Sequence, residues 1–146
     1  MMAKMLKCTC LDCGALGRFP ADKIADKPKC GVCGGWLITG KVAEIDLETL
    51  AKAARHDQVP LVVDFWAPWC GPCRMMAPQF AMAAGKMAPY VRFAKLNTEA
   101  HPAAGRRYNI RGIPTMALFK SGREVARQSG AMQAPQIQAW VAANSA

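Results

Sequence analysis

Apolar residues are distributed unevenly along the chain, and their distribution divides it near residue 40. Residues 1–40 contain only short apolar runs, and Gly40 and Lys41 mark the expected boundary. A segment of this size buries too little apolar surface to fold without a metal, disulfides or a partner. Residues 41–146 contain longer apolar runs, as a domain with its own hydrophobic core requires. We therefore expect two units, residues 1–40 and residues 41–146.

Strand patterns alternate with helix patterns in the second unit. A short strand over 42–45 leads to Asp46, which is suited to cap a helix whose apolar face carries Leu47 and Leu50. Residues 61–66 form the nearly continuous apolar run of a strand buried on both faces. The other expected elements are a helix over 72–87 kinked at Pro78, a strand over 90–97, a helix over 102–108, strands over 115–119 and 124–128 joined at Ser121–Gly122, and a last helix opening at Pro135. This order predicts an α/β fold with a central mixed sheet flanked by helices.

Composition and charge narrow the class of protein without changing this picture. The chain has 146 residues, of which 52% are hydrophobic and 20% charged, as in ordinary globular proteins. The net charge of +9 is scattered and is not interleaved with aromatic residues, so we expect no nucleic-acid partner. No apolar run reaches the roughly 18 residues of a membrane span, and the first seven residues lack a signal-peptide core. We expect a cytoplasmic monomer that does not bind membranes.

Seven cysteines add the first candidate chemistry. Six of them form three Cys-x-x-Cys pairs, and the seventh is Cys8; the pairs are Cys10 with Cys13, Cys30 with Cys33, and Cys70 with Cys73. In a secreted chain such cysteines would suggest a disulfide framework. In a reducing compartment, closely spaced pairs indicate metal binding or catalysis instead.

The pair Cys70 and Cys73 lies where the strand over 61–66 gives way to a helix. Unpaired backbone N–H groups at a helix start stabilise a thiolate, which is the reactive form of cysteine. We therefore expect Cys70 to attack disulfides. Cys73 lies one turn later and can resolve the resulting mixed disulfide, and Pro72 fits the first helical turn. The alternative, half of a zinc site, has no second free pair to complete it.

The stretch Trp66-Ala67-Pro68-Trp69-Cys70-Gly71-Pro72-Cys73 resembles the active site of thioredoxins, and the resemblance extends over residues 41–146. It implies the thioredoxin fold, protein-disulfide reduction and a role in redox homeostasis and oxidative-stress defence. It also implies disulfide-containing proteins as substrates, thioredoxin reductase, an NADPH-dependent flavoenzyme, as electron donor, and no organic cofactor of the chain's own. The resemblance assigns catalysis to Cys70, Cys73, Asp64 and Lys95, and substrate binding to Trp69, Gly71, Pro72, Ile113, Pro114 and Gly130.

Two of these residues have physical roles that can be argued separately. Burial should raise the pKa of Asp64, which suits a group that exchanges protons with Cys73 through a water. Alternatively, Asp64 points to solvent or pairs with Lys95. A cis peptide bond before Pro114 would offer backbone groups to an extended substrate, whereas a trans bond would make Pro114 an ordinary turn residue.

The remaining two pairs, Cys10 with Cys13 and Cys30 with Cys33, are separated by sixteen residues, a spacing typical of a four-cysteine zinc site. Four thiolates close the coordination shell, so we expect structural Zn²⁺ in a small zinc-ribbon-like module. Two disulfides are the rival interpretation. Residues 1–40 also resemble the extension of a zinc-binding subtype, thioredoxin 2. Cys8 departs from that pattern, but only Cys10 has the regular spacing to Cys13.

Motif content leaves two other functions open beside the reductase. In a redox sensor, oxidation would release the zinc and change how residues 1–40 dock. In a holdase-like binding module, replacing Cys70 and Cys73 by serine would leave the function intact, whereas it would abolish a reductase.

Overall fold

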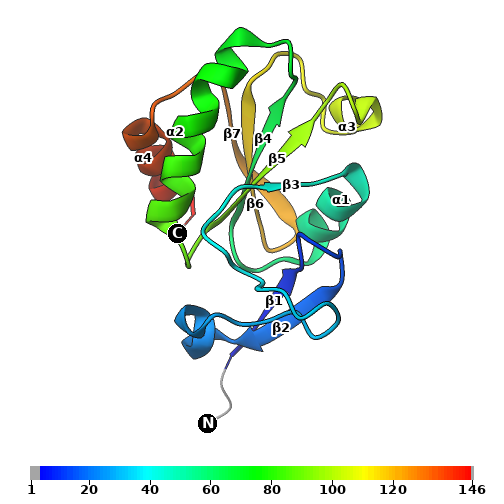
Figure 1. Ribbon diagram of the computed structural model, residues 1–146, viewed down its shortest axis with the longest axis vertical. Coiled ribbons are helices and arrows are strands. Elements are labelled where there is room, and N and C mark those ends of the chain that lie inside the picture. Colours follow the sequence, from blue (N-terminus) through cyan, green and yellow to red (C-terminus); the bar gives the residue numbers. More distant parts are fainter. Residues whose placement is uncertain (1–3, 146) are drawn as a thin grey trace.

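The structure, a computed structural model, describes residues 4–145 and contains a five-stranded mixed sheet in the order β3-β5-β4-β6-β7 (Figure 1). Strands β3, β5 and β4 are parallel, and β6 and β7 are antiparallel additions. The elements of this unit are β3 (Ala43–Glu44), α1 (Leu47–His56), β4 (Leu61–Trp66), α2 (Gly71–Met87), β5 (Arg92–Asn97), α3 (Pro102–Arg107), β6 (Thr115–Lys120), β7 (Arg123–Ser129) and α4 (Ala134–Asn144). The predicted α/β fold is confirmed.

Helices cover both faces of the sheet. Side chains of a strand alternate between the two faces, so neighbouring residues of one strand pack against different helices. Val63 and Phe65 of β4 pack in the cluster that contains residues of α1 and α3, whereas Val62 packs in the cluster with residues of α2 and α4. The run over 61–66 is buried on both faces, as predicted. Asp46 caps α1 by accepting a hydrogen bond from Thr49 N at 2.8 Å, which is also as predicted.

The first unit adds a hairpin of β1 (Met5–Thr9) and β2 (Leu16–Pro20), followed by the short 3-10 helix η1 (Ala21–Asp26). Figure 1 shows this unit below the sheet, on the side where α1 ends. A separate apolar cluster contains Cys8, Phe19 and Leu37 of the first unit together with Val59. Burial is therefore shared between the two units.

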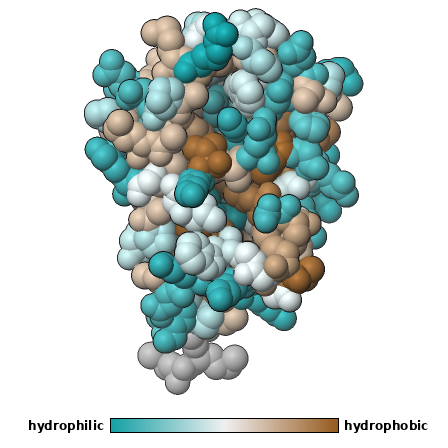
Figure 2. Space-filling view, viewed as in Figure 1, coloured by the Kyte–Doolittle hydropathy of each residue, from teal (hydrophilic) through white to brown (hydrophobic). Residues whose placement is uncertain are grey.

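The two units also meet at a cleft of about 340 Å³, lined by Leu11 and Trp36 from the first unit and by Ala43 and Ala84 from the second. Figure 2 shows apolar surface near the middle of this side of the molecule, with hydrophilic side chains around it. Among residues 4–145, no helix is both long enough and apolar enough to cross a membrane.

Candidate functional site

The dithiol lies at the junction of β4 and α2. Cys70 is the N-cap residue of α2, and its Sγ accepts a hydrogen bond from Cys73 N at 3.2 Å. The two cysteines form a disulfide, so the structure represents the oxidised form. Both are buried, with 5% of Cys70 and 2% of Cys73 exposed. The N-terminus of α2 therefore directs a backbone N–H that has no partner within the helix at the sulfur that we expect to attack.

An open groove of about 500 Å³ leads to Cys70. Four of the residues expected to bind substrate line it: Trp69, Gly71, Pro72 and Ile113. The carbonyl oxygen of Ile113 lies 3.8 Å from Cys70 Sγ, and 68% of Trp69 is exposed. The groove thus has an apolar rim and a backbone acceptor beside the reactive sulfur. Sequence reasoning missed its other lining residues, which are Thr98, Gly105, Ile110, Arg111 and Gly112.

Pro114 and Gly130 lie outside the lining of this groove within the described part of the chain. The Ile113–Pro114 peptide bond is cis, and Gly130 N donates a hydrogen bond to Pro114 O at 2.9 Å. Gly130 has φ +98°, a conformation that side chains rarely adopt, although no neighbouring atom would meet a Cβ there. Backbone conformation, and not space, therefore favours glycine beside Pro114.

Asp64 is buried on the face of the sheet that α2 covers. It lies two residues after Val62, which packs with α2, and the first helical turn of α2 carries Cys73. Only 3% of Asp64 is exposed, and its Oδ1 has no hydrogen-bond partner among residues 4–145. Burial raises the pKa of Asp64 to about 7, opposed by the positive charge of Lys95. The alternative in which Asp64 points to solvent is therefore wrong.

Lys95 is the neighbour of Asp64 on β5, in direct register. Its Nζ lies 4.9 Å from the centre of the Trp66 ring, a cation–π contact. Within the described residues, Lys95 forms no ion pair with Asp64. The carboxylate and the ammonium group therefore influence each other without a direct contact.

The second cluster of cysteines lies in the first unit. The sulfur atoms of Cys10, Cys13, Cys30 and Cys33 all lie within 4.8 Å of one another. Two of the separations are 3.7 Å, between Cys10 and Cys33, and 3.6 Å, between Cys13 and Cys30. Four sulfurs at about 2.3 Å from one Zn²⁺ in a tetrahedron lie about 3.8 Å apart, so the residues present fit the ion. The same separations are much longer than the roughly 2.05 Å of a disulfide bond.

Backbone N–H groups also point at these sulfurs. Cys13 N donates to Cys10 Sγ at 3.5 Å, and Val32 N donates to Cys30 Sγ at 3.4 Å. Hydrogen bonds from the backbone N–H groups of Cys33 and Val32 lower the pKa of Cys30 to about 6. The Gly35 N–H also acts to lower the pKa of Cys33, but hydrogen bonds with the neighbouring sulfurs, Cys10 first, raise it to about 12. Backbone N–H donors favour the thiolate, which is the form that binds a metal.

Cys8 does not belong to the four-sulfur group, as the spacing to Cys13 predicted. Its side chain is fully buried in the cluster that also contains Val59. Burial raises the pKa of Cys8 to about 12, and Arg92 opposes the rise. Cys8 is therefore a protonated packing residue at physiological pH.

Known proteins resemble both parts of the chain. Residues 41–143 match the family model described as Thioredoxin, and residues 9–35 match the one described as Thioredoxin 2, N-terminal. Thioredoxin C-3 of Corynebacterium nephridii is 42% identical over 132 residues, which cover 90% of each chain. A thioredoxin of Acidithiobacillus ferridurans is 45% identical over 82 residues, covering 56% of this chain and 76% of that one. The solved structure of a Malassezia sympodialis thioredoxin has a TM-score of 0.67 at 30% identity and covers 74% of this chain and 94% of its own.

Proposed function

The chain belongs to the thioredoxin family of thiol–disulfide oxidoreductases, and we propose that it reduces protein disulfides with Cys70 as the attacking residue and Cys73 as the resolving one. The carrying observation is the position of Cys70: its sulfur lies at the N-terminus of α2 and lines an open groove. Cys73 lies within bonding distance of it but outside the groove lining. We further propose that residues 1–40 form the metal-binding unit and residues 41–146 the reductase domain.

The first step begins with the reduced dithiol. The Cys70 thiolate attacks one sulfur of a substrate disulfide, a bond forms between these two sulfurs, and the substrate disulfide bond breaks. The second substrate sulfur leaves as a thiolate and takes up a proton. The substrate chain lies along Ile113, where its backbone can pair with the carbonyl that lies 3.8 Å from Cys70 Sγ.

The second step releases the substrate. Cys73 loses its proton and attacks Cys70 Sγ, which forms the disulfide present in the structure and releases the first substrate sulfur as a thiolate. Two electrons have then passed from the dithiol to the substrate. Asp64 is the acceptor that we assign to the Cys73 proton, because its pKa of about 7 allows it to be deprotonated before the step and protonated after it. Lys95 limits the rise of that pKa and so keeps Asp64 in its working range.

The four-cysteine cluster holds structural Zn²⁺ in this proposal. The ion would supply the cross-link that a unit of this size needs in order to fold. Reduction of Cys70 and Cys73 after each turnover requires a two-electron donor, which we propose to be thioredoxin reductase. We place the protein in the cytoplasm, as a monomer that contributes to redox homeostasis and defence against oxidative stress.

The test is a trapping experiment with Cys73→Ser. This variant can form the mixed disulfide through Cys70 but cannot resolve it, so substrate proteins remain attached and can be identified by mass spectrometry. The matched control is Cys70→Ser, which lacks the attacking sulfur. The proposal expects many proteins with Cys73→Ser and none above background with Cys70→Ser, and equal capture by the two variants would overturn it.

The redox-sensor alternative has one observation in its favour. Cys13 and Cys33 are exposed, so an oxidant can reach the metal cluster. Mild peroxide that releases Zn²⁺ as fast as it oxidises the dithiol would support a sensor. Zn²⁺ that remains bound while Cys70 and Cys73 oxidise would exclude it.

A further inference from the structure

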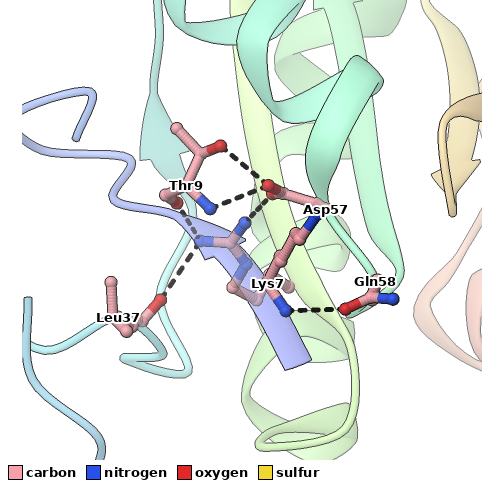
Figure 3. A network of polar contacts seen from close by, with 6 residues as sticks. Lys7, Thr9, Leu37, Asp57 and Gln58 are labelled. Atoms are coloured by element: carbon pink, nitrogen blue, oxygen red, sulfur yellow. Dashed lines mark hydrogen bonds and ion pairs between the residues drawn. The ribbon is translucent and has the colours of Figure 1, made fainter. Parts of the chain in front are cut away.

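A buried ion pair of Asp57 and Arg92, both in the second unit, lies where that unit contacts the first. Figure 3 shows Asp57 within this network of polar contacts. Arg92 is the first residue of β5, and Asp57 follows the last residue of α1. The exposed fractions of the two side chains are only 3% and 1%. Charges removed from water in this way are costly unless further polar groups satisfy them. The identity of those further groups therefore indicates what the pair is for.

The further hydrogen bonds of the pair come from the first unit, while Arg92 Nε has no partner among residues 4–145. Thr9 donates to Asp57 Oδ1 twice, from its backbone N and from its Oγ1, each at 2.7 Å. Arg92 Nη1 donates to two backbone carbonyls, Thr9 O at 2.7 Å and Leu37 O at 3.2 Å. Figure 3 shows Thr9 and Leu37 converging on this point from two separate segments. The guanidinium group of Arg92 thus donates hydrogen bonds to both segments.

Each of these segments carries one of the cysteine pairs. Thr9 directly precedes Cys10, and Leu37 follows Cys33 by four residues. The carbonyls of Thr9 and Leu37 can meet at Arg92 only when the two segments lie side by side. The four sulfurs converge at one point, and an ion bound to all of them would hold the two segments in that arrangement.

We propose that Asp57 and Arg92 form a docking socket that recognises the metal-organised form of the first unit. Metal binding at the four cysteines and the stability of the thioredoxin domain are then linked. A change that raises the affinity for the metal also raises the stability of the thioredoxin domain, and the reverse holds. The reason is that a ligand that binds only the docked, folded form stabilises that form. This inference rests on the proposed metal site but not on the chemistry of the dithiol.

The linkage predicts metal-affinity losses in variants that keep all four cysteines. Arg92→Met should lower the affinity of the full chain for Zn²⁺ by about tenfold or more, because it breaks both carbonyl contacts and leaves Asp57 buried without its cation. Thr9→Val is milder and should lower it by about three- to tenfold, since it removes only the Oγ1 donor. The matched control is Arg127→Met, which breaks the more exposed pair of Arg127 and Glu124 and should leave the affinity within about twofold.

The affinities are measured by competition for Zn²⁺ with a chromogenic chelator. A second measurement compares the Tm of the domain with and without Zn²⁺. The double variant Asp57→Leu with Arg92→Met should destabilise the fold less than Arg92→Met alone, because it leaves no unpaired buried charge. Zinc should raise its Tm by less than it raises that of the wild type.

Each outcome decides between the proposals. A lower affinity in the socket variants, with the control unchanged, supports the linkage. Wild-type affinity and a wild-type zinc-dependent Tm shift in folded socket variants would overturn the socket while the metal site stands. Absence of Zn²⁺ binding by the wild type would overturn the metal site and the socket together, and activity of the Cys70–Cys73 pair would remain as a separate question.

Discussion

Replacing Asp64 with asparagine should stabilise the oxidised protein, and the gain should grow with pH. Asp64 is almost fully buried, and burial raises its pKa from 3.8 to about 7. Between these two values the unfolded chain loses its proton while the folded chain keeps it. Rising pH therefore favours the unfolded state. The free energy of unfolding is highest below the unfolded pKa of Asp64, and it falls until the pH has passed the folded pKa. Asparagine has a similar shape and does not ionise.

The size of the effect follows from the pKa difference. Each pKa unit corresponds to about 1.4 kcal/mol, so the wild type loses a total of about 4 kcal/mol between pH 3 and pH 9. About 2 kcal/mol of this loss falls between pH 5.5 and pH 9, where the metal-binding thiolates are less affected by acid. The difference in the free energy of unfolding between Asp64→Asn and the wild type should therefore grow by about 2 kcal/mol from pH 5.5 to pH 9. It should level off above about pH 8.

Urea unfolding of the oxidised, zinc-loaded chain at pH 5.5, 7 and 9 measures this gap. Asp46→Asn is the matched control, because the Thr49 backbone N–H lowers the pKa of Asp46 below its ordinary value. Its titration is complete before pH 5.5, so its difference from the wild type should stay constant. A gap for Asp64→Asn that is independent of pH, or that narrows toward pH 9, would refute the burial-raised pKa and with it the proton role of Asp64.

Three further predictions concern the cap, the odd cysteine and the core. Asp46→Ala should lower the free energy of unfolding by about 1 kcal/mol, because it removes the acceptor that caps α1, and a loss under about 0.3 kcal/mol in urea unfolding would refute the cap. Cys8→Ala should keep the bound zinc by elemental analysis, whereas Cys10→Ala should lose it, and equal zinc content would contradict the assignment of Cys10. Phe80→Ala should cost about 3–5 kcal/mol, because this fully buried ring stacks edge-on with Phe93, and a loss below about 1 kcal/mol would contradict the packing.

Strong local patterns made the second unit predictable from sequence. The β-branched apolar run over 61–66 is typical of a buried strand, and the cap at Asp46 marked the start of α1. Where boundaries differ, the shift is small: the strand expected from residue 90 begins at Arg92, and the last helix begins one residue before Pro135. A helix cap and a continuous apolar run each involve only a few neighbouring residues, so both can be recognised in the sequence without knowledge of the fold.

The hairpin of β1 and β2 could not be predicted in the same way. Its strands are short and mix basic with apolar residues, so neither has a clear strand pattern. The hairpin also contacts a residue far away in the sequence, because Thr9 at the end of β1 donates to Asp57, which is 48 residues away. The groove residue Arg111 was also missed, although its position two residues before Ile113 was an available signal.

The ion pair of Asp57 and Arg92 is the feature that the sequence indicates least. Asp57 and Arg92 are 35 residues apart, and nothing near either residue marks it as one of a buried pair. Arg92 opens a strand of mostly buried residues, where a charged residue would ordinarily be placed at an exposed end. The fold brings the two charges together, and Thr9 of the docked first unit then forms hydrogen bonds with both of them.

We infer that one cysteine spacing serves two chemistries in this protein: disulfide exchange is confined to Cys70 and Cys73, and metal binding to the other two pairs. The most direct measurement equilibrates the zinc-loaded chain in a series of dithiothreitol redox buffers, alkylates the free thiols and quantifies each cysteine peptide by mass spectrometry. We expect Cys70 and Cys73 to change together in one two-electron transition, while Cys10, Cys13, Cys30 and Cys33 stay reduced and zinc stays bound. Oxidation of the metal-site cysteines in the same buffers as Cys70 and Cys73 would contradict it.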